Sequence, residues 1–320
     1  MARTLFFVLH AVALLGLYAA GLDHLSTWLM FLALLGTFAL GLADLAQTEH
    51  SLRRNFPLFA RARWVAEHLR PFVRQYLLES DTDGSPFNRM FRSIVYQRAK
   101  GDLDSVPFGT RVDTYREGYE WIGHSIAALN QGDLDRDPRV RIGGPDCARP
   151  YDASILNSSA MSFGALSANA VRALNKGASI GGFYQNTGEG GLSEFHRAYG
   201  GDLTWQIGTG YFGCRNPDGS FSPERFADTA ALDAVRMIEV KLSQGAKPGH
   251  GGILPASKND EVIARIRGVE PHTEVVSPSA HTAFDSPRRL LEFLARLRTL
   301  AGGKPVGFKL CVGRQSEFIA

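Results

Sequence analysis

Two apolar runs open the chain. Residues 4–22 (TLFFVLHAVALLGLYAAGL) contain one histidine, His10, and no acidic or other basic residue, and residues 25–43 (LSTWLMFLALLGTFALGLA) contain no charged residue. As a helix, each 19-residue run would be about 28 Å long, close to the ~30 Å hydrocarbon core of a bilayer. Only two residues separate the runs, so we expect a transmembrane helical hairpin within residues 1–46. The alternatives are a signal peptide behind Arg3 and a buried helical pair of a soluble protein.

The charges that follow the apolar runs predict an orientation. Between His50 and Arg74 the chain has six arginines and one acidic residue. The positive-inside rule places such a segment in the cytoplasm. We therefore expect a multi-pass membrane protein with two helices, whose termini and soluble domain are cytoplasmic. The arginines could also bind anionic headgroups of the lipid bilayer, or they could form an ordinary solvated helix face.

Residues 47–150 are expected to form a basic, helical linker and pre-barrel segment. Residues 57–79 have the pattern of a helix that is interrupted near Pro71, and a turn-forming cluster follows. Residues 119–129 (YEWIGHSIAAL) have the clearest helical pattern in the rest of this segment. We find no internal repeat, so the segment is interpreted as a connection and not as a separate large domain.

From about residue 150 the pattern alternates between short apolar or glycine-rich runs and amphipathic helices. The predicted helices cover 167–181, part of 225–244, where the helix runs into VKL, 260–269 and 286–303, and the predicted strands begin the segments 155–164, 183–191, 274–281 and 305–313. Such alternation indicates parallel strands joined by helical crossovers. The fold class is therefore α/β, and a (β/α)8 TIM barrel is favoured. A doubly wound sheet is the alternative, but no GxGxxG motif follows a first strand.

The length of this region changes the expectation. A (β/α)8 barrel needs about 250 residues, whereas 150–320 supplies 171. We therefore expect 151–320 to be the N-terminal part of a barrel, and the chain by itself to retain a phosphate-bearing cofactor poorly. The net charge of +3 does not favour nucleic-acid binding. The three cysteines are far apart, with no metal-ligand spacing, so no metal site is expected.

Three motifs carry candidate chemistry. NTGEGG (186–191) places Glu189 between glycines, which allow close backbone approach to a ligand. A carboxylate there can orient an amine or transfer a proton, although a solvated turn is the simpler interpretation. QGAKPGHGG (244–252) carries Lys247, which can bind a carboxylate or phosphate or lie in a solvated loop. Lys309 lies in an apolar strand, where a lysine needs a partner or a ligand.

Taken together, these motifs resemble a known family. SSAMSFGALS, NTGEGG, QIGTGYFG, KLSQGAKPGHGGILP, VSPSAH and GFKL occur in this order, and they resemble the FMN-binding synthase domain of glutamate synthase, in particular the membrane-associated FMN-binding glutamate synthase family. The resemblance implies an FMN-binding (β/α)8 barrel. It also implies reduction of 2-iminoglutarate, formed from 2-oxoglutarate and ammonia, to glutamate by hydride transfer from reduced flavin.

The resemblance also implies roles for individual residues. The residues implied to bind the cofactor are Ala160, Met161, Ser162, Gln206, Thr209 and Lys309. The residues implied to bind the substrate are Gln244, Lys247 and Arg267. The residues implied to take part in catalysis are Glu189, Lys247 and Lys309, with Lys309 beside the flavin ring.

The chain departs from the family pattern at three positions. Ile253 replaces a glutamine that would contact substrate, His250 replaces a glutamate, and Tyr211 replaces an arginine. An FMN oxidoreductase for a different 2-oxo or 2-hydroxy acid is therefore an alternative, and a truncated, non-catalytic membrane protein is another. An Fe–S cluster would need residues beyond these 320, and the residues present include no glutamine amidotransferase domain. The sequence names neither the electron donor nor the ammonia source.

Overall fold

A computed structural model describes residues 2–102, 109–245 and 249–320. The chain divides into two compact units, Met1–Ser125 and Ile126–Ala320. Each unit is described by itself below.

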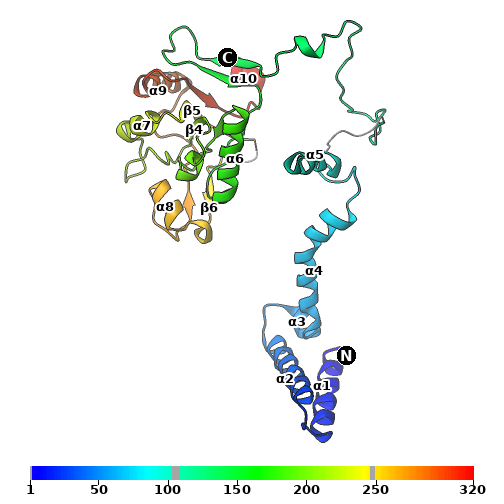
Figure 1. The fold of residues 1–320 in the computed structure, drawn as a ribbon. Helices are drawn as coiled ribbons and strands as arrows, with labels where there is room; N and C mark the ends of the chain where they lie inside the picture. Colours follow the sequence, from blue (N-terminus) through cyan, green and yellow to red (C-terminus); the bar gives the residue numbers. More distant parts are fainter. Residues whose placement is uncertain (1, 103–108, 246–248) are drawn as a thin grey trace. The chain divides into compact units, whose positions relative to one another are not determined.

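The first unit begins with a helical hairpin. Helix α1 (Ala2–Ala19) lies beside α2 (Leu25–Ala46), as Figure 1 shows. Phe6 is buried against Gly41, where an added Cβ would lie 2.4 Å from the phenylalanine ring. Among the described residues, only α2 is long and apolar enough to cross a membrane, and α1 is a shorter apolar helix. The predicted first helix is therefore present, but it ends three residues earlier than the apolar run.

Hydrogen bonds of the buried Asp44 connect the helical hairpin to the segment that follows it. Asp44, near the end of α2, accepts hydrogen bonds from Arg61 at 2.6 and 3.1 Å and from the Leu58 backbone N–H at 3.1 Å. Four helical segments follow α2: α3 (Ser51–Asn55), α4 (Phe59–Val73), the π-helical turn η1 (Arg74–Leu78) and α5 (Arg89–Lys100). Pro71 lies inside α4, which continues to Val73 and then directly into η1, so the helix is not interrupted at Pro71 as predicted but changes to π-helical hydrogen bonding three residues later.

The helix predicted over residues 119–129 is wrong. These residues contain no helix, and Trp121 and Ile122 are exposed. A short helix is marginal in water unless its apolar face is packed. In the structure the large apolar side chains of this segment, Ile126 and Leu129 included, are exposed, and Gly123 lowers its helix propensity further.

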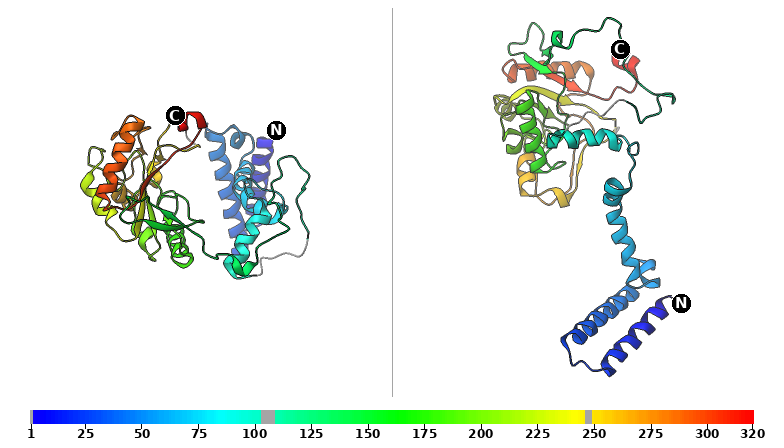
Figure 2. Two further views of the ribbon diagram at one scale, coloured as in Figure 1. Left: turned by 90° about the horizontal axis from the view of Figure 1, so that it is seen from above. Right: turned by 45° about the vertical axis from the view of Figure 1, so that its right-hand side comes forward.

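The second unit is a mixed α/β structure with a parallel sheet. A hairpin of two antiparallel strands, β1 (Arg139–Ile142) and β2 (Tyr151–Ser154), comes first. The parallel sheet has the order β3-β4-β5-β8, in which the strands are β3 (Gln185–Asn186), β4 (Leu203–Ile207), β5 (Val235–Lys241) and β8 (Val306–Lys309). Ser158 makes one further parallel bridge, to Gln185. Figure 2 shows the sheet from two more directions.

The strand order distinguishes between the two predicted architectures. The spatial order of the four strands is the same as their order in the chain. Each new strand is therefore added at the same edge of the sheet, next to the strand that precedes it. A doubly wound sheet reverses at a switch point, whereas a barrel wall does not. The order therefore favours the wall of a barrel, while closure of the barrel stays a prediction.

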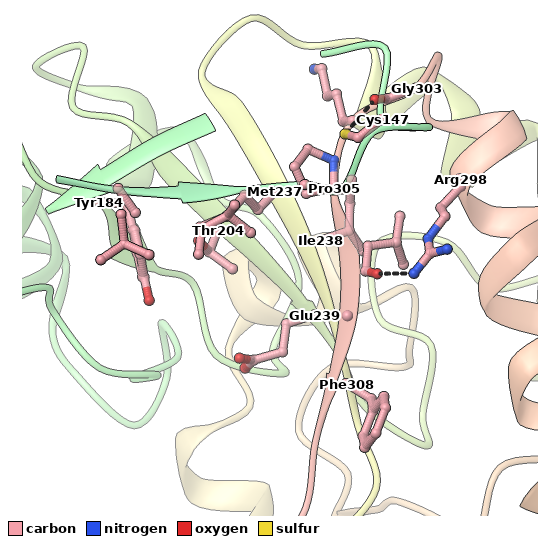
Figure 3. A pocket seen from close by; sticks show the side chains of 18 of the residues that line it. Cys147, Tyr184, Thr204, Met237, Ile238, Glu239, Arg298, Gly303, Pro305 and Phe308 are labelled. Atoms are coloured by element: carbon pink, nitrogen blue, oxygen red, sulfur yellow. Dashed lines mark hydrogen bonds between the residues drawn. The ribbon is translucent and has the colours of Figure 1, made fainter. Parts of the chain in front are cut away.

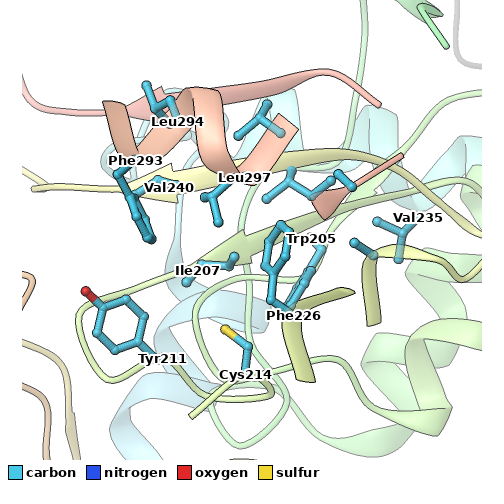
Figure 4. Packing of buried hydrophobic residues seen from close by; sticks show 14 of the residues in the cluster. Trp205, Ile207, Tyr211, Cys214, Phe226, Val235, Val240, Phe293, Leu294 and Leu297 are labelled. Carbon is cyan, nitrogen blue, oxygen red and sulfur yellow. The ribbon is translucent and has the colours of Figure 1, made fainter. Parts of the chain in front are cut away.

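Helices cover one face of this sheet. The helices of the unit are α6 (Ala168–Gly181), α7 (Pro223–Ala230), α8 (Glu261–Arg267), α9 (Pro287–Leu300) and α10 (Gln315–Ile319), with 3-10 turns η2 (Gln131–Asp133), η3 (Glu194–Arg197) and η4 (Ala256–Lys258). Trp205 and Val240 of the sheet pack with Phe226 of α7 and Leu297 of α9 (Figure 4). Side chains alternate between the faces of a strand, so the other face is free to carry polar residues.

The predicted strand at residues 274–281 is paired differently from the expectation. β7 (Val275–Val276) pairs antiparallel with β6 (Ile253–Leu254), in a separate two-stranded sheet. The prediction of a parallel strand here is therefore wrong, because two apolar residues can pair with any nearby edge. The strand predicted within 305–313 is β8, but only Val306 of it is buried.

Candidate active site

The face of the parallel sheet opposite the helices carries polar and charged side chains. Gln206 of β4 and Glu239 of β5 are register partners. Two residues further along β5, on the same face, Lys241 is the register partner of Lys309 of β8. Of these four residues, Glu239 lines a cavity of about 870 Å3, together with Thr204 and residues of the β1–β2 hairpin, whereas Gln206, Lys241 and Lys309 are not among its lining residues. Figure 3 shows Thr204, Met237 and Glu239 around this cavity. Large concave sites with a few convergent polar groups are typical of ligand-binding sites.

An ion pair lies at the carboxyl end of β5. Nζ of Lys241 is 2.7 Å from Oε1 of Glu189, and the side chains are 10% and 25% exposed. Glycines make room for the carboxylate: an added Cβ at Gly208 would lie 2.4 Å from its Oε2, and one at Gly252 would lie 3.2 Å from its Oε1. Glu189, in the NTGEGG loop, therefore lies close to the segments that contain Gly208 and Gly252 and forms its ion pair with Lys241.

The NTGEGG loop lies directly against the segment around Ser162. Gly188 has φ +65°, and an added Cβ there would lie 2.6 Å from the Ser162 backbone nitrogen and 2.9 Å from the Met161 carbonyl carbon. Only glycine fits such an approach without displacing backbone. The structure thus brings the predicted cofactor segment, Ala160 to Ser162, beside the loop that carries the predicted catalytic carboxylate.

Arg267 is a buried guanidinium without a carboxylate partner among the described residues. Its side chain lies over the Phe212 ring at 5.1 Å, and Nη2 donates to the Phe163 carbonyl at 3.3 Å. The residue is 8% exposed, and its Nε has no hydrogen-bond partner in the part of the chain that the structure describes. Burial lowers the pKa of Arg267, and the nearby Glu189 partly opposes that effect. A buried, unsatisfied guanidinium beside a glycine loop is suited to binding an anion.

A second network holds the loop after β7. His281 contacts the Tyr211 hydroxyl through Nδ1 at 3.0 Å and the Lys241 carbonyl through Nε2 at 2.8 Å. A carbonyl only accepts, so Nε2 carries the hydrogen and Nδ1 accepts from the hydroxyl. Burial lowers the pKa of His281, which agrees with this neutral form. The backbone that carries Lys241 is therefore tied to the loop, and Tyr211, one of the departures from the family pattern, supplies a link.

The structure places only some of the predicted site residues close to Glu189. Thr209 is buried and donates to the Pro278 carbonyl at 2.6 Å, and Gln206 is buried on the polar face. Gln244 and Lys309 are half-buried near the carboxyl ends of β5 and β8. Lys247 lies outside the described residues.

Three further residues of this site were not predicted: Lys241, Glu239 and His281. A signal for the first two exists in the sequence, because the end of the strand, IEVK (238–241), alternates apolar and charged positions. Such alternation marks a strand with one polar face. His281 ends the VSPSAH motif, but the resemblance assigned it no role.

Comparison with known proteins identifies the family. A family model described as the conserved region in glutamate synthase matches residues 130–320. The chain belongs to the glutamate synthase family. The matched residues include the parallel sheet, the NTGEGG loop and Arg267.

Individual relatives agree with this assignment. The glutamate synthase large subunit-like protein YerD of Bacillus subtilis (strain 168) is 34% identical over 313 residues, which cover 86% of this chain and 59% of the relative. An archaeal-type glutamate synthase [NADPH] of Thermotoga neapolitana is 29% identical over 270 residues, covering 81% of this chain and 49% of the relative. An archaeal glutamate synthase [NADPH] of Archaeoglobus fulgidus is 35% identical over 163 residues, 51% of this chain and 29% of the relative. The chain spans about half the length of the first two relatives.

Proposed function

We propose that this chain is part of a membrane-anchored, FMN-dependent oxidoreductase that forms glutamate from 2-oxoglutarate and ammonia. The observation that carries the proposal is the Glu189–Lys241 ion pair, which lies beside a polar sheet face with Arg267 close to the same loop. The family match and the names of the relatives support the glutamate synthase assignment. The names of two relatives also point to NADPH as the source of electrons.

The residues present suit FMN by chemical type. Gln206 offers an amide, Lys309 offers a cation for an anionic ring, and Thr204, which lines the cavity, has a buried hydroxyl without a hydrogen-bond partner among the described residues. The half-buried segment from Ala160 to Ser162 offers backbone groups. Bound FMN in its reduced form would supply the hydride that turns 2-iminoglutarate into glutamate. A closed (β/α)8 barrel is part of this proposal.

The substrate is a dianion, and the chain offers cations to hold it. Arg267 would bind one carboxylate, because a buried guanidinium gains most from an anionic partner. The loop that contains Gln244 would approach the other end of the substrate. Glu189 would orient ammonia or the imine nitrogen and accept or return a proton there, while Lys241 keeps this carboxylate in place.

Membrane anchoring is part of the proposal. The apolar helix α2 and the shorter α1 form a hairpin, and the arginine-rich α3 and α4 follow it. An arginine-rich flank of this kind favours the cytoplasmic side. The soluble unit would then act in the cytoplasm, where 2-oxoglutarate and ammonium are at hand.

A second candidate function is reduction of a different 2-oxo acid. Ile253 stands where the family pattern has a polar residue, is 53% exposed, and follows Gly252, which lies against Glu189. A site that lacks a polar partner discriminates between substrates differently from one that has it.

One experiment decides between the two candidates. The full-length protein is purified in detergent, its flavin content is measured, and the flavin is photoreduced without oxygen. The return of flavin absorbance is then followed after adding 2-oxoglutarate with ammonium, 2-oxoglutarate alone, or other 2-oxo acids with ammonium. Reoxidation with glutamate as product supports the first candidate. Reoxidation only by another 2-oxo acid supports the second, and a protein without flavin contradicts both.

A further inference from the structure

Glu239 stands in the polar face of the sheet without a cationic partner. Its Oε1 accepts a hydrogen bond from Asn186 Nδ2 at 3.1 Å and another from Gln206 Nε2. Among the described residues it forms no ion pair, in contrast to Glu189 with Lys241. Its side chain points into the cavity (Figure 3). One carboxylate therefore joins three neighbouring strands through two neutral amides.

This arrangement fixes how the two amides are turned. An ionised carboxylate only accepts hydrogen bonds, so both amides must present their NH2 groups to Glu239. The Asn186 carbonyl oxygen is then free to accept from the Gly188 N–H at 3.0 Å, which shapes the start of the NTGEGG loop. The Gln206 carbonyl oxygen is turned away from Glu239 in the same manner.

We propose that Glu239 is a positioning residue that sets the orientation of the Gln206 amide and, through it, the affinity for FMN. This inference rests on the proposed function, because the resemblance assigns Gln206 to the cofactor. A glutamine without this anchor could turn its amide over, and half of its orientations would present the wrong group to a ligand. A charged acceptor removes that freedom, since hydrogen bonds to ionised groups are stronger than neutral ones.

The test measures FMN affinity and not turnover. Flavin is removed from the full-length protein in detergent, and FMN is titrated back while flavin fluorescence is followed. Glu239→Gln is compared with Gln206→Ala, with the double variant, and with Glu292→Gln as a matched control on the exposed side of α9. We expect Glu239→Gln to weaken FMN binding about tenfold and Glu292→Gln to leave it within twofold.

The double variant tests whether Glu239 acts through Gln206. If it does, Glu239→Gln with Gln206→Ala binds FMN no worse than Gln206→Ala alone. Effects that multiply would overturn the inference, as would wild-type affinity in Glu239→Gln. A wild-type protein that binds no FMN would instead overturn the proposed function, and the inference with it.

A swapped pair separates positioning from folding. Glu239→Gln combined with Gln206→Glu restores the hydrogen bonds, because the introduced glutamine can donate to the introduced carboxylate and accept from Asn186. We expect the melting temperature of the flavin-free protein to recover while FMN affinity stays low, since a carboxylate now faces the ligand. If both recover, the pair is only structural and the inference is wrong.

Discussion

Lys241 and Glu189 are 52 residues apart in the chain, and their Nζ and Oε1 atoms are 2.7 Å apart at the carboxyl ends of two strands. Replacing one partner of a largely buried pair leaves the other charge unpaired. We expect Lys241→Met to slow reoxidation of reduced flavin by 2-oxoglutarate and ammonium at least tenfold. Lys258→Met, at the exposed end of η4, is the control. Equal rates in the two variants would contradict a role for the ion pair.

Arg267 and Arg265 lie on the same helix, α8, but only Arg267 is buried. Removing a guanidinium that binds a substrate carboxylate costs about 1.5–3 kcal/mol. Arg267→Gln is therefore expected to raise the half-saturating 2-oxoglutarate concentration roughly tenfold or more, with a smaller change in the limiting rate. Arg265→Gln should match the wild type. A lower limiting rate at unchanged half-saturation would argue against substrate binding by Arg267.

Gly188→Ala should damage the contact between the NTGEGG loop and Ser162. An alanine there needs φ +65° and places Cβ 2.6 Å from a backbone nitrogen. We expect a loss of on the order of 1–3 kcal/mol in unfolding free energy, measured by urea titration. Gly177→Ala, in the middle of α6 with its nearest neighbour at 3.9 Å, is the control, and it should be neutral or stabilising. An equally large loss in Gly177→Ala would contradict the prediction, because the destabilisation would then not be specific to the contact between Gly188 and Ser162.

His196 predicts a pH dependence of stability. It is buried, its Nδ1 lies 2.8 Å from the Ser193 hydroxyl and accepts from the Ser193 N–H at 3.2 Å, and burial lowers its pKa to about 4 from 6.5. Between pH 6.5 and about 4 the unfolded chain binds a proton that the folded chain does not. Stability should therefore fall as the pH falls through this window, by on the order of 3 kcal/mol at most.

The check on His196 is a series of urea titrations across that pH range. His196→Gln should flatten the dependence, whereas His124→Gln, at an exposed position, should leave it unchanged. An unchanged slope in His196→Gln would refute the assignment.

The hairpin of α1 and α2 predicts the behaviour of the protein in cells. The protein should stay in the membrane fraction after an alkaline carbonate wash, and a variant that lacks residues 1–46 should not. In inverted vesicles, protease should reach the segment after residue 50, because the arginines there favour the cytoplasmic face. Cleavage only from the opposite face would reverse the proposed topology.

Local signals in the sequence predicted the helices of the second unit well. Ser167, Asp260 and Ser286 each accept a hydrogen bond from the backbone N–H three residues later, so the helix starts were encoded in single side chains. Glycines at 182 and 268 end two of these helices in left-handed conformations. Such features need no knowledge of distant residues.

The features that the sequence did not predict depend on distant partners. Lys241 ends β5, and nothing near it in the chain indicates that Glu189 lies beside it. The partner and direction of β7 are likewise set by β6, which is more than twenty residues away. The segment 119–129 has a helical pattern, but its large apolar side chains are exposed in the structure. Pairing and packing across the chain decided each of these cases.

The order of the parallel sheet also bears on how the protein is made. β3, β4 and β5 are synthesised in the sequence in which they stand side by side, so each can dock on a completed neighbour as it leaves the ribosome. β8 is the exception, because the whole stretch from the β6–β7 pair to α9 is translated before it can join β5. During that interval β5 is an edge strand with unpaired backbone groups, and such an edge promotes aggregation.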